Sequence, residues 1–151
     1  MVAAADIVLI VSIVLLGLSA GLFFGFSVAV MPGLLTVGDS VFVATMNSIN
    51  RAILNPVFFL VFVGAVLGPA AAAVLAFLGG DPVQGILAAA ATLVYVIGVL
   101  AVTARVNVPL NDSLARNGDR QAYEPRWVRF NTVRTWSSLV AFVLGVVALA
   151  L

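Results

Sequence analysis

The sequence predicts an all-α integral membrane protein, a four-transmembrane-helix bundle with an amphipathic interfacial helix between spans 1 and 2. Of its 151 residues, 64% are hydrophobic and only 9% are charged, whereas a soluble domain carries about 25% charged residues. Four apolar stretches each approach or exceed the roughly 20 residues that cross a bilayer as a helix. We therefore expect a single transmembrane domain over 1–151.

The composition excludes several functional classes. Cysteine and histidine are absent, so disulfides, thiolate or imidazole metal sites and Ser-His or Cys-His triads are not available. A formal charge of +1 excludes electrostatic binding of nucleic acid. We expect no metal site and no cofactor. The partners that remain are the lipid bilayer and a lipophilic small molecule.

The spans are predicted at about 7–30, 56–78, 83–104 and 126–151. The start of the chain lacks the basic region and cleavage site of a signal peptide, so the first span should be retained. Asn55-Pro56 and Asp81-Pro82 each place a capping residue before a proline suited to the first helical position. Spans 2 and 3, joined by a short turn, should be an antiparallel pair. The fourth run is too short from Thr135 alone, and its extension back to 126 brings arginine into the membrane.

Between spans 1 and 2, an amphipathic helix is predicted. Apolar residues recur at helical spacing, and the opposite face carries Asn47, Asn50 and Arg51. Such a pattern is typical of a helix that lies at the membrane interface or dips into the bundle.

The arginines predict the orientation. All seven basic residues are arginine, and most lie in the segments 31–55 and 105–125, whereas the N-terminal tail and the turn near Asp81 carry none. By the positive-inside rule, both long connections face the cytoplasm and both termini face outward. The arginine, alanine, valine and glycine usage is typical of a GC-rich bacterial genome, so we expect the bacterial cytoplasmic (inner) membrane.

Polar side chains inside the predicted spans are candidate functional residues, because they are costly in a bilayer. On the fourth helix Trp127, Asn131, Arg134 and Ser138 share one stripe, and on the third helix Tyr95 and the residues Thr92, Thr103 and Asn107 share a face. Most of them lie toward the cytoplasmic ends. They predict a partly polar cavity that opens near the cytoplasmic interface.

Structural interpretations remain open for each of these residues. Arg134 can pair with Asp112 and fix the last hairpin, and the asparagines can serve as hydrogen bonds between helices. Trp127 and Trp136 can be interfacial anchors. Glycines recur every four residues at 17, 21 and 25 and at 64 and 68, which allows either close packing inside the bundle or a homo-oligomer contact.

Two stretches of the sequence carry a family resemblance. The run Arg105-Val-Asn-Val-Pro-Leu-Asn-Asp-Ser-Leu-Ala115 and the run Trp127-Val-Arg-Phe-Asn-Thr-Val-Arg-Thr135 resemble the anthrone-oxygenase-like family. The first half of the chain fits the same family through Met31-Pro32-Gly33-Leu34, Asn50-Arg51 and Asn55-Pro56. These are small four-span membrane proteins. Characterised fungal members are associated with the oxidation of anthrones to anthraquinones without a bound metal or flavin.

The resemblance implies a cofactor-independent membrane oxygenase that acts with O₂ on an anthrone-like or other lipophilic phenolic or quinol substrate. Arg134 and Asn131 are then candidate donors to a developing oxyanion, and Asp112 is the candidate base. The candidate substrate-binding residues are Asn107, Asn111, Asn50, Arg51, Tyr95, Trp127 and Trp136. Two alternatives stay open, namely a non-catalytic membrane subunit or assembly factor, and a protein that binds or transports a lipophilic small molecule.

Overall fold

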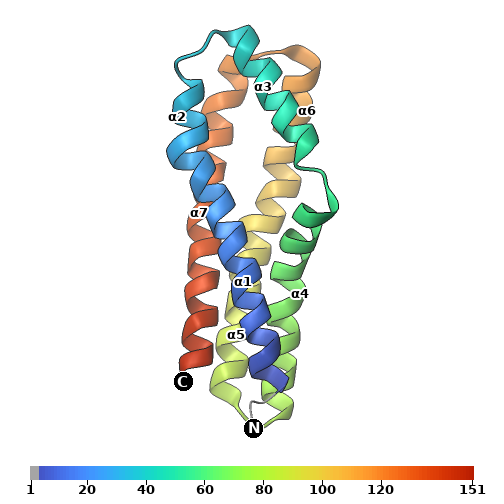
Figure 1. Ribbon diagram of the computed structural model, residues 1–151, viewed down its shortest axis with the longest axis vertical. Coiled ribbons are helices and arrows are strands. Elements are labelled where there is room, and N and C mark those ends of the chain that lie inside the picture. Colours follow the sequence, from blue (N-terminus) through green and yellow to red (C-terminus); the bar gives the residue numbers. More distant parts are fainter. Residues whose placement is uncertain (1–3) are drawn as a thin grey trace.

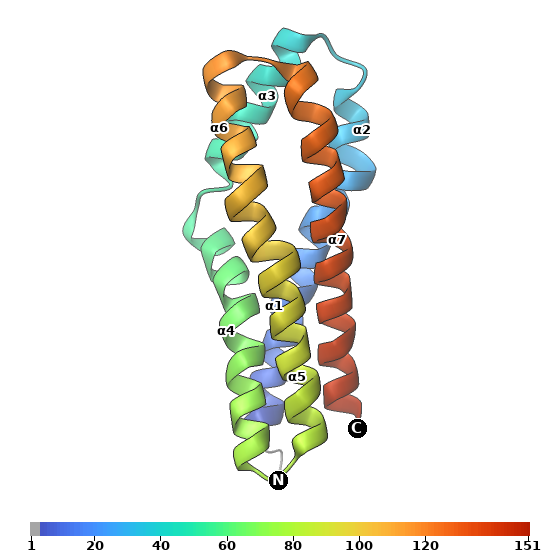
Figure 2. The same cartoon turned by 180° about the vertical axis from the view of Figure 1, so that it is seen from behind.

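A computed structural model, which describes residues 4–151, shows an all-helical bundle (Figures 1 and 2). The first long helix consists of α1 (Ala4–Gly25), the π-helical η1 (Phe26–Val30) and α2 (Met31–Leu34). The short helix α3 (Asp39–Ala52) follows, and α4 (Pro56–Leu78) is the second long helix. The third long helix consists of α5 (Pro82–Tyr95), the π-helical η2 (Val96–Ala101) and η3 (Thr103–Asn107), and α6 (Val108–Asn117). The fourth long helix is α7 (Arg120–Ala150). Four helices in this part of the chain are long and apolar enough to cross a membrane, as predicted.

Several helices are longer than predicted. The first helix continues to Leu34 and the third to Asn117, so the predicted connection over 105–125 is helical except at Gly118 and Asp119, which separate the last two helices. Proline has no amide hydrogen and clashes with the carbonyl four residues before it. Both Pro32 and Pro109 lie two residues after the end of a π-helical segment, where the wider turn lets the helix pass through the proline.

The predicted helix boundaries at the capping residues are confirmed. Asn55 accepts a hydrogen bond from Phe58 N at 3.0 Å, and Asp81 accepts one from Gln84 N at 2.9 Å. Gly80 adopts φ +82°, a left-handed conformation that glycine reaches without steric cost. The turn between α4 and α5 is therefore tight, and the two helices form the expected antiparallel pair.

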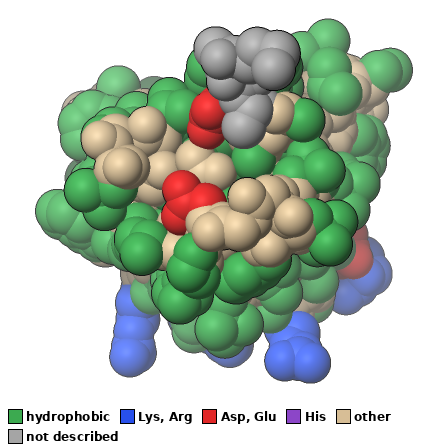
Figure 3. Space-filling model, turned by 90° about the horizontal axis from the view of Figure 1, so that it is seen from below, with side chains coloured by type: hydrophobic (Ala, Val, Ile, Leu, Met, Phe, Trp, Pro, Cys, Tyr) green, Lys and Arg blue, Asp and Glu red, His purple; other side chains and the backbone are tan. Residues whose placement is uncertain are grey.

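The two ends of the bundle differ in charge. The start of α1 at Ala4, the C-terminus and the turn at 79–81 lie at one end, here called the lower end, and α3 and α6 lie toward the upper end (Figures 1 and 2). Figure 3, which views the lower end, shows acidic side chains there and arginines only at the margin of the view. The start of α1 and the C-terminus thus share one side of the bundle, as four spans require.

The core also differs between the two halves. In the lower half, small residues allow close helix contact, with Ala72, Ala73, Ala88 and Ala148 packed around Leu9. In the upper half the buried residues are large and include Tyr123 and Trp127. The amphipathic α3 buries Phe42 and Met46 in this upper cluster. It therefore packs into the upper end of the bundle, and its position relative to the membrane interface stays a prediction.

Candidate functional site

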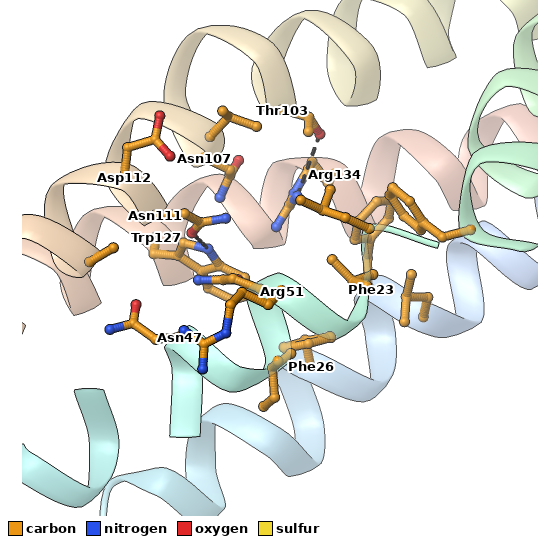
Figure 4. A pocket seen from close by; sticks show the side chains of 18 residues that line it. Phe23, Phe26, Asn47, Arg51, Thr103, Asn107, Asn111, Asp112, Trp127 and Arg134 are labelled. Carbon is orange, nitrogen blue, oxygen red and sulfur yellow. Dashed lines mark hydrogen bonds between the residues drawn. The ribbon is translucent and has the colours of Figure 1, made fainter. Parts of the chain in front are cut away.

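A cavity of about 330 Å³ lies in the upper half of the bundle (Figure 4). This volume is within the range of small-molecule sites, roughly 300–1,000 Å³. Side chains from α1, η1, α3, the start of α4, η3, α6 and α7 line it, together with residues between α3 and α4. They are Leu22, Phe23, Phe26, Asn47, Ile49, Asn50, Arg51, Ile53, Leu54, Phe58, Thr103, Asn107, Val108, Asn111, Asp112, Ala115, Trp127 and Arg134.

Arg134 projects from α7 into this cavity and is only 6% exposed. Its Nη2 donates to Asn131 Oδ1 at 2.9 Å, and its Nη1 donates to Thr103 Oγ1 at 3.4 Å. The guanidinium carbon lies 4.5 Å from the centroid of the Phe23 ring and 5.2 Å from that of Trp127, within cation–π range. Its Nε has no hydrogen-bond partner among residues 4–151.

The ion pair between Arg134 and Asp112, one of the two interpretations of Arg134, does not form. Over the described part of the chain, both salt bridges belong to Arg120. Neutral dipoles and aromatic faces therefore hold the Arg134 guanidinium, which leaves its charge without a carboxylate. A buried cation in this state is costly, so its presence at a cavity favours a binding role.

Asn131 is fully paired and does not line the cavity. Besides accepting from Arg134, it donates through Nδ2 to Phe23 O at 3.0 Å and to Ser27 Oγ at 2.8 Å. These bonds tie α7 to the end of α1 and fix the Arg134 guanidinium. The side-chain donor and acceptor atoms of Asn131, which was predicted as a catalytic donor, are therefore already engaged within the bundle, and its catalytic role stays a prediction.

Thr103, Asn107 and Asn111 follow one another at four-residue spacing along η3 and α6 and all line the cavity. Asn111 Oδ1 accepts from Trp127 Nε1 at 3.1 Å and from the Tyr123 hydroxyl at 3.0 Å. Asn107 is 1% exposed, and within the described chain neither its Nδ2 nor its Oδ1 has a hydrogen-bond partner. Such buried, unpaired amide atoms are rare in native structures.

The helix α3 supplies further polar groups. Among the described residues, Asn47 Oδ1 and Asn50 Nδ2 are buried and form no hydrogen bond, although the Asn50 side chain interacts with the Tyr123 hydroxyl. All five buried side-chain atoms that lack a hydrogen bond in residues 4–151 belong to residues that line this one cavity. Asn47 was not among the predicted site residues, although it shares the polar face of Asn50 and Arg51.

The mouth of the cavity is marked by its exposed lining residues. Arg51 and Leu54 lie on one side, at the junction of α3 and α4, and Val108, Asp112 and Ala115 lie on α6. Asp112 stands apart from Arg134 (Figure 4), and its carboxylate forms no salt bridge in residues 4–151. Asp112 therefore lies at the edge of the cavity and not in its interior, and its role as a base stays a prediction.

Two predicted substrate-binding residues do not line the cavity. Tyr95 is fully buried and its hydroxyl lies 2.7 Å from Ser19 Oγ. Trp136 is 63% exposed on the outer face of α7. It follows Trp127 by nine residues, which is two and a half turns of an α-helix, and so it points the opposite way. Neither ring therefore borders this cavity, and a role of Tyr95 and Trp136 in substrate binding stays a prediction.

Other aromatic rings border the cavity instead. Phe23, Phe26 and Phe58 line the cavity together with Trp127, and the Phe26 and Trp127 ring centroids are 5.4 Å apart. These phenylalanines were not predicted, because a phenylalanine inside an apolar span looks the same whether it faces lipid or a cavity.

The fold and the site define a small multi-pass membrane protein with a polar-edged cavity of ligand size. The sequence model of the anthrone oxygenase family matches residues 58–144, which is more than half of the chain. The protein belongs to this family. No curated protein and no solved structure matches the chain. The matched region contains Asn107 and Arg134 but not the α1 and α3 walls of the cavity.

Proposed function

We propose that this protein is a membrane oxygenase that uses O₂ to oxidise an anthrone-like or other lipophilic phenolic or quinol substrate, without a metal or flavin. The observation that carries the proposal is the buried Arg134 guanidinium, with its free Nε beside the unpaired Asn107 amide, in a cavity with aromatic walls. These donors are fixed in advance, in surroundings where electrostatic stabilisation is strong.

The reaction begins with proton transfer. The methylene group of an anthrone lies between two aryl rings and is conjugated to the carbonyl, so its C–H is acidic. Asp112 takes this proton, and the negative charge moves to the carbonyl oxygen. Arg134 and Asn107 stabilise that oxyanion by hydrogen bonding, the role of an oxyanion hole.

Oxygen then accepts electrons from the enolate. One electron passes to O₂, and the resulting superoxide and carbon radical combine into a C–O bond. The peroxide takes back the proton held by Asp112. Loss of water breaks the O–O bond and removes the second methylene proton, which leaves the new carbonyl. One substrate and one O₂ thus give one quinone and one water, with the substrate as the source of all electrons.

The apolar walls suit both reactants. Leu22, Phe26, Ile49 and Phe58 present hydrocarbon to the cavity, and flat aromatic molecules pack well on aromatic side chains. O₂ also dissolves better in apolar surroundings than in water. We further propose that the upper end faces the cytoplasm of a bacterial inner membrane, because the arginines lie toward that end.

Oxygen consumption tests the proposal. Purified protein treated with a chelator should consume O₂ when anthrone is added, and Arg134→Met should lower the rate by about 10²–10³-fold, the loss typical of one oxyanion-hole donor. Arg129→Met is the matched control, since Arg129 is an exposed residue of the same helix. It should retain the wild-type rate.

Several results would contradict the proposal. O₂ uptake that is absent in the wild type, or equal in both variants, removes the catalytic role. If Arg134→Met instead prevents folding, the residue is a packing element. Co-purification with a stable partner at fixed stoichiometry would favour a non-catalytic subunit, and ligand binding without O₂ uptake would favour a binding or transport protein.

A further inference from the structure

The positive and negative charges that line the cavity are unequal in number. The lining contains two guanidiniums, Arg51 and Arg134, and one carboxylate, Asp112. Arg51 and Asp112 are exposed at the mouth, where water screens their charges. Arg134 is 6% exposed in the interior and has no salt-bridge partner in residues 4–151. The cavity therefore carries one positive charge that a monoanion would neutralise.

Asn107 adds a second requirement that a ligand would have to meet, because its buried amide needs hydrogen-bond partners. It lies four residues after Thr103, whose hydroxyl accepts the Arg134 hydrogen bond, so the amide lies close to one turn further along η3. Figure 4 draws Asn107 and Arg134 next to each other at the cavity. Within the described chain, Asn107 offers one free donor and one free acceptor there. A buried amide needs both groups satisfied.

We propose that the cavity selects lipophilic weak acids that it holds as monoanions, including the enolate that forms when Asp112 takes the substrate proton, and that carry a hydroxyl group next to the oxyanion. The oxyanion accepts from Arg134 Nε and Asn107 Nδ2, and the neighbouring hydroxyl donates to Asn107 Oδ1. The apolar body of the ligand lies against Phe26, Phe58 and the other hydrocarbon walls. This inference rests on the proposed function in taking the cavity as the substrate site, and it assigns the chemical class of the substrate.

Other ligand classes fit less well. A fatty acyl chain without an ionised group leaves both Arg134 and Asn107 unpaired. Inorganic phosphate satisfies the charge, but it leaves the leucine, isoleucine and phenylalanine walls facing a hydrated ion. A planar aromatic acid with two neighbouring oxygens satisfies the charge, the amide and the walls together.

Three dyes test the selection directly. 1,2-Dihydroxyanthraquinone has an ionisable phenol with a neighbouring hydroxyl, 2-hydroxyanthraquinone has the ionisable phenol alone, and anthraquinone has neither. Each is already a quinone and has no methylene group to oxidise. Ionisation of either phenol shifts its visible absorption to longer wavelength, so the charge state of the bound dye can be read from its spectrum.

The wild-type protein should bind the two phenols as anions. Their ionisation should occur about one pH unit lower when bound, which corresponds to a tenfold preference for the anion. 1,2-Dihydroxyanthraquinone should bind about tenfold more tightly than 2-hydroxyanthraquinone, and anthraquinone should bind most weakly.

Two variants separate the contributions. Arg134→Met should abolish the shift in ionisation. Asn107→Leu should keep the shift but abolish the difference between the two phenols. Its thermal stability should equal or exceed that of the wild type, because leucine replaces a buried amide whose hydrogen bonds are not made in the free protein. Asn117→Leu, at an exposed position on α6, is the matched control and should change neither property.

The results distinguish this inference from the proposed function. If the wild type binds anthraquinone as tightly as the phenols, or binds the phenols without a shift in ionisation, the inference is overturned even when O₂ uptake is observed. If the dyes behave as expected but anthrone causes no O₂ uptake, the oxygenase proposal fails and the anion selectivity stands. An Asn107→Leu protein that discriminates like the wild type would also overturn the inference.

Discussion

The lower and upper halves of this bundle differ in whether their buried polar groups form hydrogen bonds. In the lower half, Ser12 donates to Val8 O at 2.6 Å and Gln84 donates to Asp6 Oδ1 at 2.8 Å. In the upper half, Asn47, Asn50, Asn107 and Arg134 each keep a buried atom that forms no hydrogen bond among the residues described. Small residues bring the lower helices into close contact, whereas the upper helices surround a cavity.

This difference suggests that the lower half mainly provides stability and that the upper half provides the functional site. In a bilayer, helices associate through close packing and hydrogen bonds, since lipid provides no hydrophobic drive. The lower half is held together by close packing and by hydrogen bonds. At the cavity, the upper half lacks part of the packing and several of the hydrogen bonds, and such a departure from local optimisation is typical of a functional site. Substitutions in the two halves should therefore affect different measurements.

The largest effect on activity is expected from Asp112→Asn in the upper half. Removal of a general base typically costs about 10²–10⁴-fold in rate, so O₂ uptake with anthrone should fall by at least about 100-fold. Thermal unfolding should stay unchanged, because Asp112 is exposed and forms no salt bridge in residues 4–151.

Asp119→Asn controls for the loss of one negative charge near the same end. Asp119 caps α7 by accepting from Ala122 N at 3.0 Å, and asparagine caps helices equally well. Both activity and stability should be retained. Equal activity of Asp112→Asn and the wild type would transfer the role of base to water or to another group.

The sequence predicted the spans well because bilayer thickness imposes a strict length on apolar helices. It predicted their ends poorly at Pro32 and Pro109, where a π-helical turn lets the helix continue. No simple residue pattern announces such a turn.

The same π-helical turns explain part of the outcome at the site. On a helical wheel Tyr95 and Asn107 lie about 120° apart, at opposite edges of the predicted polar face, and η2 and η3, which lie between them, further change the number of residues per turn. Tyr95 therefore faces Ser19, and Asn107 faces the cavity. Arg134 was predictable because an arginine within an apolar helix is costly unless it has a function. Trp136 could have been rejected from its spacing to Trp127 alone.

The next largest effect should come from Gly98→Val, which breaks the close packing below the cavity. A Cβ atom on Gly98 would overlap the Ser137 side chain on α7. Overpacking of this kind costs about 1–3 kcal/mol, so the unfolding temperature should drop. Gly33→Val is the matched control, because nothing lies within 4 Å of a Cβ there. Equal stability of the two variants would show that the helices can separate at this contact without cost.

A smaller and local effect is expected from Arg120→Met at the upper end. Arg120 donates to Leu34 O at 3.1 Å and Val37 O at 2.8 Å, and it forms salt bridges with Asp39 and Glu124. It thereby holds the turn from α2 to α3. Hydrogen exchange should accelerate in α3 and remain unchanged in α4 and α5. Uniform acceleration across all helices would mean that the two halves unfold as one unit.

The smallest effect on the single chain should come from Gly21→Leu. A Cβ on Gly21 meets no atom within 4 Å, and substitutions at such exposed positions usually change stability by about 0.5 kcal/mol or less. Gly17, four residues earlier, instead packs against Phe142, so the predicted glycine ridge is only partly used inside the bundle. If the free part forms a homo-oligomer contact, Gly21→Leu should shift the detergent-solubilised protein to a smaller mass in light scattering. An unchanged mass with unchanged stability would leave the ridge without an oligomeric role.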